Sequence, residues 1–240
     1  MIGAVAISTR GLVKRYGRKR ALDGFSLDVP RGSVFGVVGA NGAGKTTWML
    51  TVAGFLRPDG GRIGLLGTDG FDARVHAGRV AVLPQDSELP LEAHALGLLR
   101  TFARLQGLSR ATARKAALEA LEAVHLADRA HDSVRSLSHG MRKRLMVAQC
   151  FLGVPEVVLL DEPMNGLDPG EAERMRSLIL GRRGERTVVI SSHNLLDLER
   201  LCTHVAFVVA GKVVCAAPLA ELKSDGESLE DLYRRHVGQA

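Results

Sequence analysis

The stretch that decides the fold reads Gly39-Ala40-Asn41-Gly42-Ala43-Gly44-Lys45-Thr46, with Thr47 directly after it. The apolar run Val34–Val38 precedes it and predicts a buried strand, and residues 47–55 follow with the length and apolarity of a helix. A glycine-rich loop that ends in Lys-Thr, between a strand and a helix, is the phosphate-binding loop in the context it requires. The stretch therefore predicts a site for a nucleoside triphosphate.

The residue types of this loop suit phosphate chemistry. Glycines let successive backbone N–H groups turn inward without a Cβ in the way, and the following helix adds its own unpaired N–H groups and positive end. Lys45 is expected beside the β- and γ-phosphates, and the hydroxyl group of Thr46 is expected to hold Mg²⁺. The alternative is a glycine-rich turn that binds nothing, and the complete pattern in register disfavours it.

Composition bounds the class of protein. With 240 residues, 46% of them hydrophobic, the chain has room for one large α/β domain. Only 4% of residues are aromatic, which argues against stacking platforms for single-stranded nucleic acid. The net charge of +6 is spread along the chain, with small basic clusters at residues 14–20 and 142–144. We interpret these clusters mainly as solvated surface, leave a contribution from a membrane surface open, and expect no nucleic-acid partner.

Cysteine spacing and hydropathy indicate the compartment. Cys150, Cys202 and Cys215 are widely spaced and form no C-x-x-C pair, which predicts small buried thiols in a reducing compartment. No apolar run approaches the roughly 20 residues of a membrane-spanning helix. The first nine residues are too short for a signal peptide. We expect a cytosolic protein, or one that another protein holds at a membrane.

Periodicity outlines the remaining elements. Strands are predicted at residues 4–12 and 25–29, joined through a basic loop that contains Tyr16, and at residues 62–66, 80–83, 157–160, 187–191, 205–209 and 213–216. A helical segment rich in Ala, Leu, Arg and Glu covers residues 91–126, with Ser109 as the N-cap of a helix over 111–124. Further helices are predicted at residues 137–152, 170–180, 219–223 and 228–236.

Two acids follow the most apolar strand of the chain. Val157 to Leu160 are continuously apolar, which favours a strand buried on both faces and hence a parallel sheet. Asp161 and Glu162 come next, at the carboxyl end where open α/β sheets bind their ligands. We expect Asp161 to serve the metal and Glu162 to act as general base for the attacking water. The alternative is a pair of surface acids that cap a turn.

Seven short motifs in one order carry a resemblance. They are Tyr16, the phosphate loop, Gln85, Leu137-Ser138-His139-Gly140-Met141, Leu159-Leu160-Asp161-Glu162-Pro163, Asn165-Gly166-Leu167-Asp168 and Ser191-Ser192-His193, with the helical segment between Gln85 and Leu137. Only the phosphate loop is specific on its own, but the ordered set is very specific. The chain resembles, over its whole length, an ABC-type ATPase, the nucleotide-binding subunit of an ABC transporter.

The resemblance implies a fold with three parts. It predicts an α/β P-loop NTPase core of the RecA-like type with a mostly parallel sheet, an antiparallel β subdomain and an α-helical subdomain. Residues 1–85 and 143–240 are expected to form the core with the β subdomain, and residues 86–142 the α-helical subdomain that carries the signature motif.

The resemblance also implies roles for residues within one subunit. Tyr16 is expected to stack on adenine, and Gly39 to Thr47 to bind the phosphates. Gln85 is expected to contact Mg²⁺ or the attacking water and to report nucleotide state to the helical subdomain. His193 is expected to contact the γ-phosphate and hold the catalytic geometry together with Lys45 and Glu162.

Other motif residues are implied to act across two subunits. Ser138 and Gly140 are expected to bind the γ-phosphate of a nucleotide held by the opposite subunit, which suits a helix N-terminus preceded by serine. Asp168 is expected in the loop that communicates between the two sites. His139 and Met141 depart from the usual Leu-Ser-Gly-Gly-Gln signature, and we interpret this as a variant signature, similar to that of exporters. Met164 also replaces the usual threonine after Glu-Pro.

These expectations combine into one function. Two ATPase subunits, identical or different, are expected to face each other head to tail around two ATP molecules. They are expected to drive substrate movement, in the direction of export, through a separate transmembrane permease at the cytoplasmic side of the cell membrane. Residues 84–91 are where the permease is expected to dock. The alternatives are a soluble ABC ATPase of protein or cofactor assembly, and a nucleotide-binding regulator that does not hydrolyse ATP; the retention of Lys45, Asp161, Glu162 and His193 argues against the regulator.

Overall fold

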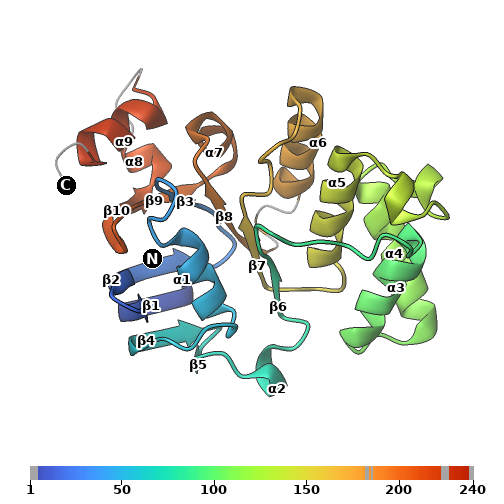
Figure 1. The fold of residues 1–240 in the computed structure, drawn as a ribbon, viewed down its shortest axis with the longest axis horizontal. Helices are drawn as coiled ribbons and strands as arrows, with labels where there is room; N and C mark the ends of the chain where they lie inside the picture. The colour runs from blue at the N-terminus through green and yellow to red at the C-terminus, as the bar shows by residue number, and fades with distance from the viewer. Residues whose placement is uncertain (1–4, 182–183, 185, 223–226, 238–240) are drawn as a thin grey trace.

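A six-stranded sheet runs through the middle of the molecule (Figure 1). The computed structural model describes residues 5–181, 184, 186–222 and 227–237. The order of the strands is β10-β9-β3-β8-β7-β6, in which β6, β7, β8, β3 and β9 are parallel and β10 is antiparallel to β9. Their bounds are β3 Val34–Val38, β6 Val80–Leu83, β7 Val157–Asp161, β8 Thr187–Ser192, β9 His204–Val209 and β10 Lys212–Pro218. The predicted mostly parallel sheet is confirmed.

Both faces of this sheet are covered, as the continuous apolar strands predict. Every residue of β3, β7 and β8 is buried. Alternate residues of one strand belong to two different cores: Val158 and Leu160 pack with the helices, whereas Val157 and Leu159 pack with α1 and the antiparallel sheet. The carboxyl ends of the buried strands are consequently rigid platforms for the polar residues that follow them.

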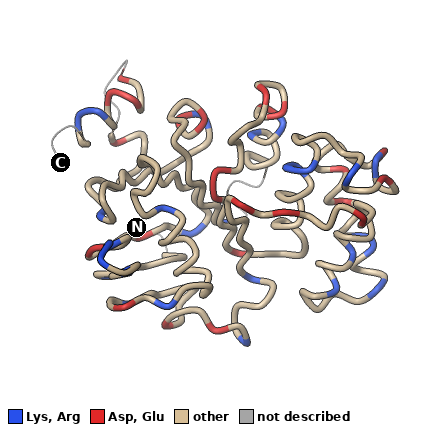
Figure 2. The backbone as a smooth tube through the Cα atoms, in the orientation of Figure 1, with Lys and Arg blue, Asp and Glu red and all other residues tan. Residues whose placement is uncertain are grey.

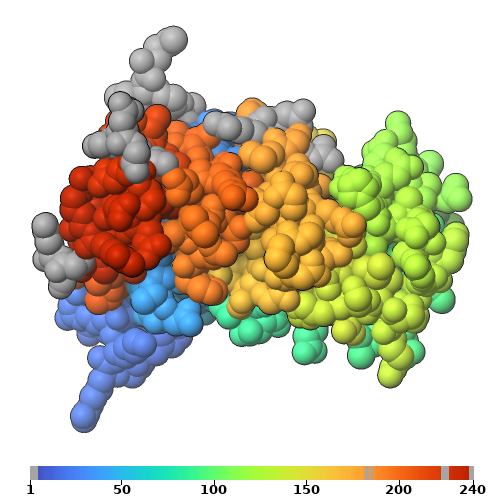
Figure 3. All heavy atoms as spheres, turned by 90° about the horizontal axis from the view of Figure 1, so that it is seen from above, coloured from blue at the N-terminus to red at the C-terminus, as the bar shows by residue number. Residues whose placement is uncertain are grey.

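The antiparallel sheet has the order β2-β1-β4-β5. Its strands are β1 Val5–Tyr16, β2 Lys19–Pro30, β4 Gly60–Leu65 and β5 Thr68–Asp69. The prediction of a basic loop around Tyr16 is wrong, because β1 and β2 continue through these residues and Tyr16 pairs with Lys19 across a two-residue turn. In the space-filling view the N-terminal part of the chain, blue, projects at one corner of the molecule (Figure 3).

The helices lie on both faces and at one end of the parallel sheet (Figure 1). Their bounds are α1 Lys45–Val52, α2 Ala73–His76, α3 Ala95–Leu105, α4 Arg110–Ala123, α5 His139–Cys150, α6 Pro169–Leu180, α7 Leu195–Leu201, α8 Leu219–Leu222 and α9 Leu229–Val237, with 3₁₀ turns at Ala127–Arg129 and Val134–Ser136. Helices α3, α4 and α5 pack on one another at the end away from the antiparallel sheet. None of the helices in the described part of the chain is long and apolar enough to cross a membrane.

Several elements begin or end at residues other than those predicted. The N-cap role of Ser109 is confirmed, since its hydroxyl group accepts from the N–H of Thr112. The helical segment does not begin at Leu91, because Leu91 and Glu92 form a turn, and the carbonyl group of Leu91 accepts from the N–H of Arg135. Helix α1 begins at Lys45 rather than Thr47, and the short helices α2 and α7 have no counterpart in the prediction. The predicted ends at residues 4 and 223 lie outside the described residues.

One basic cluster is not solvated surface. Lys and Arg are otherwise scattered among Asp and Glu (Figure 2). Within residues 142–144, however, Lys143 is only 6% exposed and Arg144 only 3%. The guanidinium Nε of Arg144 lies 2.5 Å from Oε2 of Glu171, which ties α5 to α6. Packing of α5 against β6 and the other helices thus buries cations that sequence alone assigns to the surface.

Candidate functional site

The phosphate loop, both acids and two other predicted residues surround one cavity of about 350 Å³. It is lined by Tyr16, Lys19, Ala21, Asn41, Gly42, Gly44, Lys45, Thr46, Thr47, Gln85, Asp161 and Glu162. These residues come from the β1–β2 hairpin, the turn into α1 and the carboxyl ends of β6 and β7. Parallel strands bring their carboxyl ends to one edge of the sheet, which is why residues 120 positions apart in the chain meet here.

The loop closes tightly around Lys45. The ammonium Nζ donates to the carbonyl oxygen of Gly39 at 2.6 Å and to that of Ala40 at 3.3 Å, so these residues form the back of the loop. Ala43 is buried beneath it. Gly44 has a φ of 111°, and a Cβ there would lie 2.5 Å from the carbonyl oxygen of Ala21. Only glycine fits this close approach, which lets the backbone N–H groups that open α1 face the cavity.

Asp161 and Glu162 present two unused oxygen atoms. The hydroxyl group of Ser191, on the neighbouring strand β8, donates to Oδ1 of Asp161 and accepts from the N–H of Glu162 at 3.0 Å. Glu162 has a φ of 49°, a strained conformation for a residue with a side chain. Oδ2 of Asp161 and Oε1 of Glu162 are buried without a hydrogen-bond partner. Buried carboxylate oxygens without a partner fit a divalent cation and an attacking water, and this is the observation that supports Mg²⁺ at the site.

Glu162 lies between two basic side chains. Oε1 is 3.8 Å from Nζ of Lys45, in an ion pair in which both side chains are buried. Oε2 is 3.0 Å from Nδ1 of His193, which follows β8 and is half exposed. The predicted histidine therefore reaches the site through the carboxylate of Glu162 rather than by lining the cavity.

Three further predicted residues, Ser138, Gly140 and Asp168, also lie outside the cavity. The hydroxyl group of Ser138 accepts from the N–H of Met141 and caps α5. Asp168 accepts from the N–H groups of Gly170 and Glu171 and caps α6. Gly140 packs against Glu171, where a Cβ would lie 2.9 Å from Cγ of that residue. The N-termini of α5 and α6 thus form one surface apart from the phosphate loop.

Lys19 and Ala21 line the cavity, and the sequence analysis did not single them out. Nζ of Lys19 lies 3.6 Å from the position that a Cβ on Gly42 would occupy, so the ammonium group reaches the glycine loop. The signal that could have identified Lys19 is its place three residues after Tyr16, on the strand that pairs back along β1.

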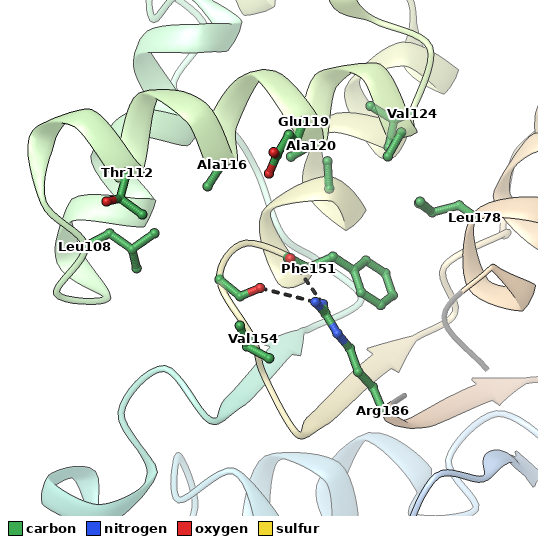
Figure 4. Close-up of a pocket in the computed structure, with 13 residues that line it drawn as sticks. Leu108, Thr112, Ala116, Glu119, Ala120, Val124, Phe151, Val154, Leu178 and Arg186 are labelled. Carbon is green, nitrogen blue, oxygen red and sulfur yellow. Dashed lines mark hydrogen bonds between the residues drawn. The ribbon is translucent and has the colours of Figure 1, made fainter. Parts of the chain in front are cut away.

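A second cavity, of about 400 Å³, lies between α4 and the turn after α5 (Figure 4). Its lining is largely apolar, and Arg186 points into it with its guanidinium group 5.7 Å from the centre of the Phe151 ring. Arg186 donates to the carbonyl oxygens of Phe151 and Gly153. These bonds hold the turn between α5 and β7.

The family model for ABC transporters matches residues 22–165. The chain belongs to the ABC transporter family. It is 41% identical to the daunorubicin resistance ATP-binding protein DrrA3 of Streptomyces coeruleorubidus, over 98% of this chain and 75% of that protein. It is 38% identical to the Nod factor export ATP-binding protein I of Ralstonia nicotianae (strain ATCC BAA-1114 / GMI1000), over 92% of this chain and 70% of that protein.

The fold agrees with solved structures of the same family. An ATP-binding subunit of an ABC transporter superimposes with a TM-score of 0.85 at 25% sequence identity, over 97% of this chain and 99% of that one. The predicted P-loop NTPase fold is confirmed, and so is the predicted resemblance to ABC-type ATPases. This ABC protein is an ATP-binding subunit that hydrolyses ATP.

Proposed function

We propose that this ABC subunit powers export through a separate permease, as one half of a head-to-tail pair of ATPase subunits. The relatives support this proposal, since one is named for drug resistance and another for Nod factor export. The observation that carries it is the pair of buried, unpartnered oxygen atoms on Asp161 and Glu162 beside Lys45 in the phosphate-loop cavity. A surface turn would leave these oxygens in water.

Within one subunit, each group at the cavity has a proposed task. Tyr16 stacks on the adenine ring, and the loop N–H groups bind the phosphates. Lys45 exchanges its carbonyl partners for the β- and γ-phosphate oxygens. Thr46, Gln85 and Asp161 would hold Mg²⁺, which neutralises charge on the phosphates when it is bound.

Hydrolysis then depends on Glu162. Its Oε1, which has no hydrogen-bond partner, accepts a proton from the attacking water, while His193 holds Oε2 and fixes the orientation of the carboxylate. Because the carboxylate is already oriented in the described structure, little reorganisation is needed when ATP enters. His193 therefore acts on the geometry of the base as well as on the γ-phosphate.

The second half of each site comes from the opposite subunit. Ser138, Gly140 and Asp168 lie outside the phosphate-loop cavity of their own chain, so they serve a nucleotide only across an interface. The capped N-terminus of α5 offers N–H groups and a positive helix end to a γ-phosphate. We further propose that residues 86–142 move as an α-helical subdomain when the pair closes.

The permease is proposed to dock at residues 84–91. Ser87, Glu88, Leu89 and Leu91 from this stretch line a cavity of about 380 Å³ with His139, Arg142 and Met146 of α5. Leu91 is 42% exposed, so Leu91→Asp changes the surface without a buried charge. We expect Leu91→Asp to abolish transport and leave basal ATPase activity intact. Loss of both together would contradict docking at this stretch.

The proposed function is tested by size-exclusion chromatography of Glu162→Gln, with Mg²⁺-free ATP and without nucleotide. Blocked hydrolysis is expected to trap the closed pair, so ATP shifts the protein from monomer to dimer. Lys45→Ala in the same background is the control and stays monomeric. If ATP still binds but the elution volume does not change, the proposal that two identical subunits form the pair is contradicted. If the chain does not co-purify with detergent-solubilised membranes, the result would instead favour a soluble assembly ATPase.

A further inference from the structure

Ser191 is a buried residue to which the ATPase mechanism above gives no task. It lies in β8 directly after Val188, Val189 and Ile190, so a polar side chain follows an apolar run within one buried strand. Ser191 is 0% exposed. A hydroxyl group removed from water costs free energy unless hydrogen bonds within the protein replace those it made to water. The partners of this hydroxyl group therefore indicate what the residue does.

The hydroxyl group of Ser191 contacts both acids of the site. It donates its proton to Oδ1 of Asp161. It also accepts from the N–H of Glu162, with 3.0 Å between Oγ and the nitrogen atom. The parallel pairing of β7 with β8 sets Asp161 opposite Ser191, so the register of the two strands brings these groups together. One donated and one accepted bond satisfy the buried hydroxyl group.

The bond to Asp161 determines which of its two oxygen atoms remains available. Ser191 holds Oδ1, whereas Oδ2 is buried without a hydrogen-bond partner in the described part of the chain. Rotation of the carboxylate would exchange the two oxygens, and a hydrogen bond to the charged group opposes that rotation. Carboxylates that bind metal ions are commonly held by such bonds. Ser191 thus fixes the orientation in which Asp161 offers Oδ2 to the cavity that it lines.

Ser191 also holds the backbone of Glu162. The N–H of Glu162 has two acceptors on this one residue, the hydroxyl oxygen at 3.0 Å and the carbonyl oxygen at 3.2 Å. Glu162 has a φ of 49°, a conformation that persists only where the surrounding structure holds it. The direction of a side chain depends on the backbone that carries it, so these bonds bear on where the carboxylate of Glu162 points.

We propose that Ser191 is a positioning residue for ATP hydrolysis: its hydroxyl group holds Asp161 and Glu162 in one fixed relative orientation. The oxygen proposed for the metal ion is thereby aligned with the oxygen proposed for the attacking water. This inference rests on the proposed roles of the two acids. The chain at the end of β8 supports Glu162 twice, because Ser191 holds its backbone and His193 holds Oε2 of its carboxylate.

A purely structural role for Ser191 makes a different prediction. If the hydroxyl group only satisfies buried polar atoms, Ser191→Ala lowers the melting temperature and leaves the rate of the folded protein unchanged. If it positions the acids, we expect kcat to fall about 10- to 100-fold, the usual effect of losing a group that orients a metal-binding or catalytic side chain. The phosphate loop is not altered, so KM and the Kd for a fluorescent ATP analogue without Mg²⁺ are expected to change less than about twofold.

The experiment measures kcat, KM, this Kd and Tm for Ser191→Ala and Ser191→Thr. Ser191→Thr keeps the hydroxyl group and is expected to restore most of kcat. Thr187→Val is the matched control, because it removes a buried hydroxyl group at the other end of β8, which accepts from the N–H of Gly32 at 3.0 Å. We expect this control to keep the wild-type kcat. A kcat for Ser191→Ala within about twofold of wild type, or an equal loss in Thr187→Val, would overturn the inference.

Metal binding gives a measurement that does not depend on turnover. Mn²⁺ serves as the probe in place of Mg²⁺, and its affinity for the protein loaded with a nonhydrolysable ATP analogue is measured by electron paramagnetic resonance. We expect Ser191→Ala to weaken the binding of Mn²⁺ about 10-fold, because Oδ2 of Asp161 loses its fixed orientation. An unchanged affinity for Mn²⁺ would contradict the proposed hold on Asp161.

Glu162→Gln separates this inference from the proposed function. Wild-type kcat in Glu162→Gln would refute the proposed general base, whatever the result for Ser191. An inactive Glu162→Gln together with wild-type kcat in Ser191→Ala would refute only the role of Ser191.

Discussion

Nδ1 of His193 lies 3.0 Å from Oε2 of Glu162, while Oε1 of the same carboxylate has no hydrogen-bond partner. One oxygen of the proposed general base is thus held and the other is left available. The imidazole that holds it follows β8, and the carboxylate follows β7, so the register of two neighbouring strands sets this contact.

Removing the imidazole of His193 is therefore expected to disturb the orientation of the Glu162 carboxylate more than the binding of ATP. We expect His193→Ala to lower kcat about 10- to 100-fold, with the Kd for ATP nearly unchanged, because the carboxylate loses the bond that holds Oε2. Steady-state ATPase kinetics and nucleotide titration check this prediction. His131→Ala, an exposed histidine near α3, is the control. An equal loss in affinity and rate would assign His193 to ATP binding instead.

Lys19 supplies a second positive charge at the phosphate loop. We expect Lys19→Ala to weaken ATP binding severalfold and to make binding less sensitive to salt, because an ammonium group near the glycine loop attracts the triphosphate. Arg18→Ala, one residue away at the exposed turn of the hairpin, is the control. Equal effects of the two substitutions in fluorescence titrations would indicate a general surface field rather than contact at the site.

Ser138 combines a structural and a proposed functional task, and one substitution separates them. Aspartate caps helices as well as serine does, so Ser138→Asp is expected to change the stability of α5 by less than about 1 kcal/mol. Its negative charge would oppose a γ-phosphate from the opposite subunit. We expect Glu162→Gln/Ser138→Asp to unfold like Glu162→Gln but to stay monomeric with ATP. A dimer in the presence of ATP would refute the trans contact.

The burial of Cys150 predicts that the folded protein loses stability at alkaline pH. Burial raises the pKa of its thiol to about 12, against an ordinary value of 9.0. A group whose pKa is raised on folding stabilises the folded state below its unfolded pKa, and this stability is lost as the pH rises from about 9 towards 12. Between pH 8 and pH 10, the urea midpoint of unfolding is expected to fall less for Cys150→Ala than for the wild type. Equal decreases would contradict the shift.

Thiol accessibility gives a separate test of cysteine burial. Cys150 and Cys202 are buried as predicted, whereas Cys215 is only partly buried. Iodoacetamide is therefore expected to label Cys215 first in the folded protein. Mass spectrometry of the digested peptides measures the order in which the cysteines are labelled. Faster labelling of Cys150 would show that α5 opens more readily than its packing indicates.

Local sequence determined the phosphate loop, the paired acids after a buried strand and the α/β class, because short-range backbone chemistry and hydrophobic periodicity decide these features. The glycines around Lys45 and the continuous apolarity of β7 each act within a few residues. The ends of elements were less predictable, as at Leu91, because hydrogen bonds to distant segments such as the one from Arg135 set them.

Only the tertiary structure decided which charges are buried and which polar atoms meet. Lys143 lies in a basic run that sequence assigns to the surface, yet packing of α5 on β6 and on the other helices leaves it buried. The same folding brings Lys19 to the phosphate loop and leaves Ser138 outside the cavity. Such outcomes depend on how elements far apart in the chain pack, and a pattern read along one segment contains no information about the segment that will cover it.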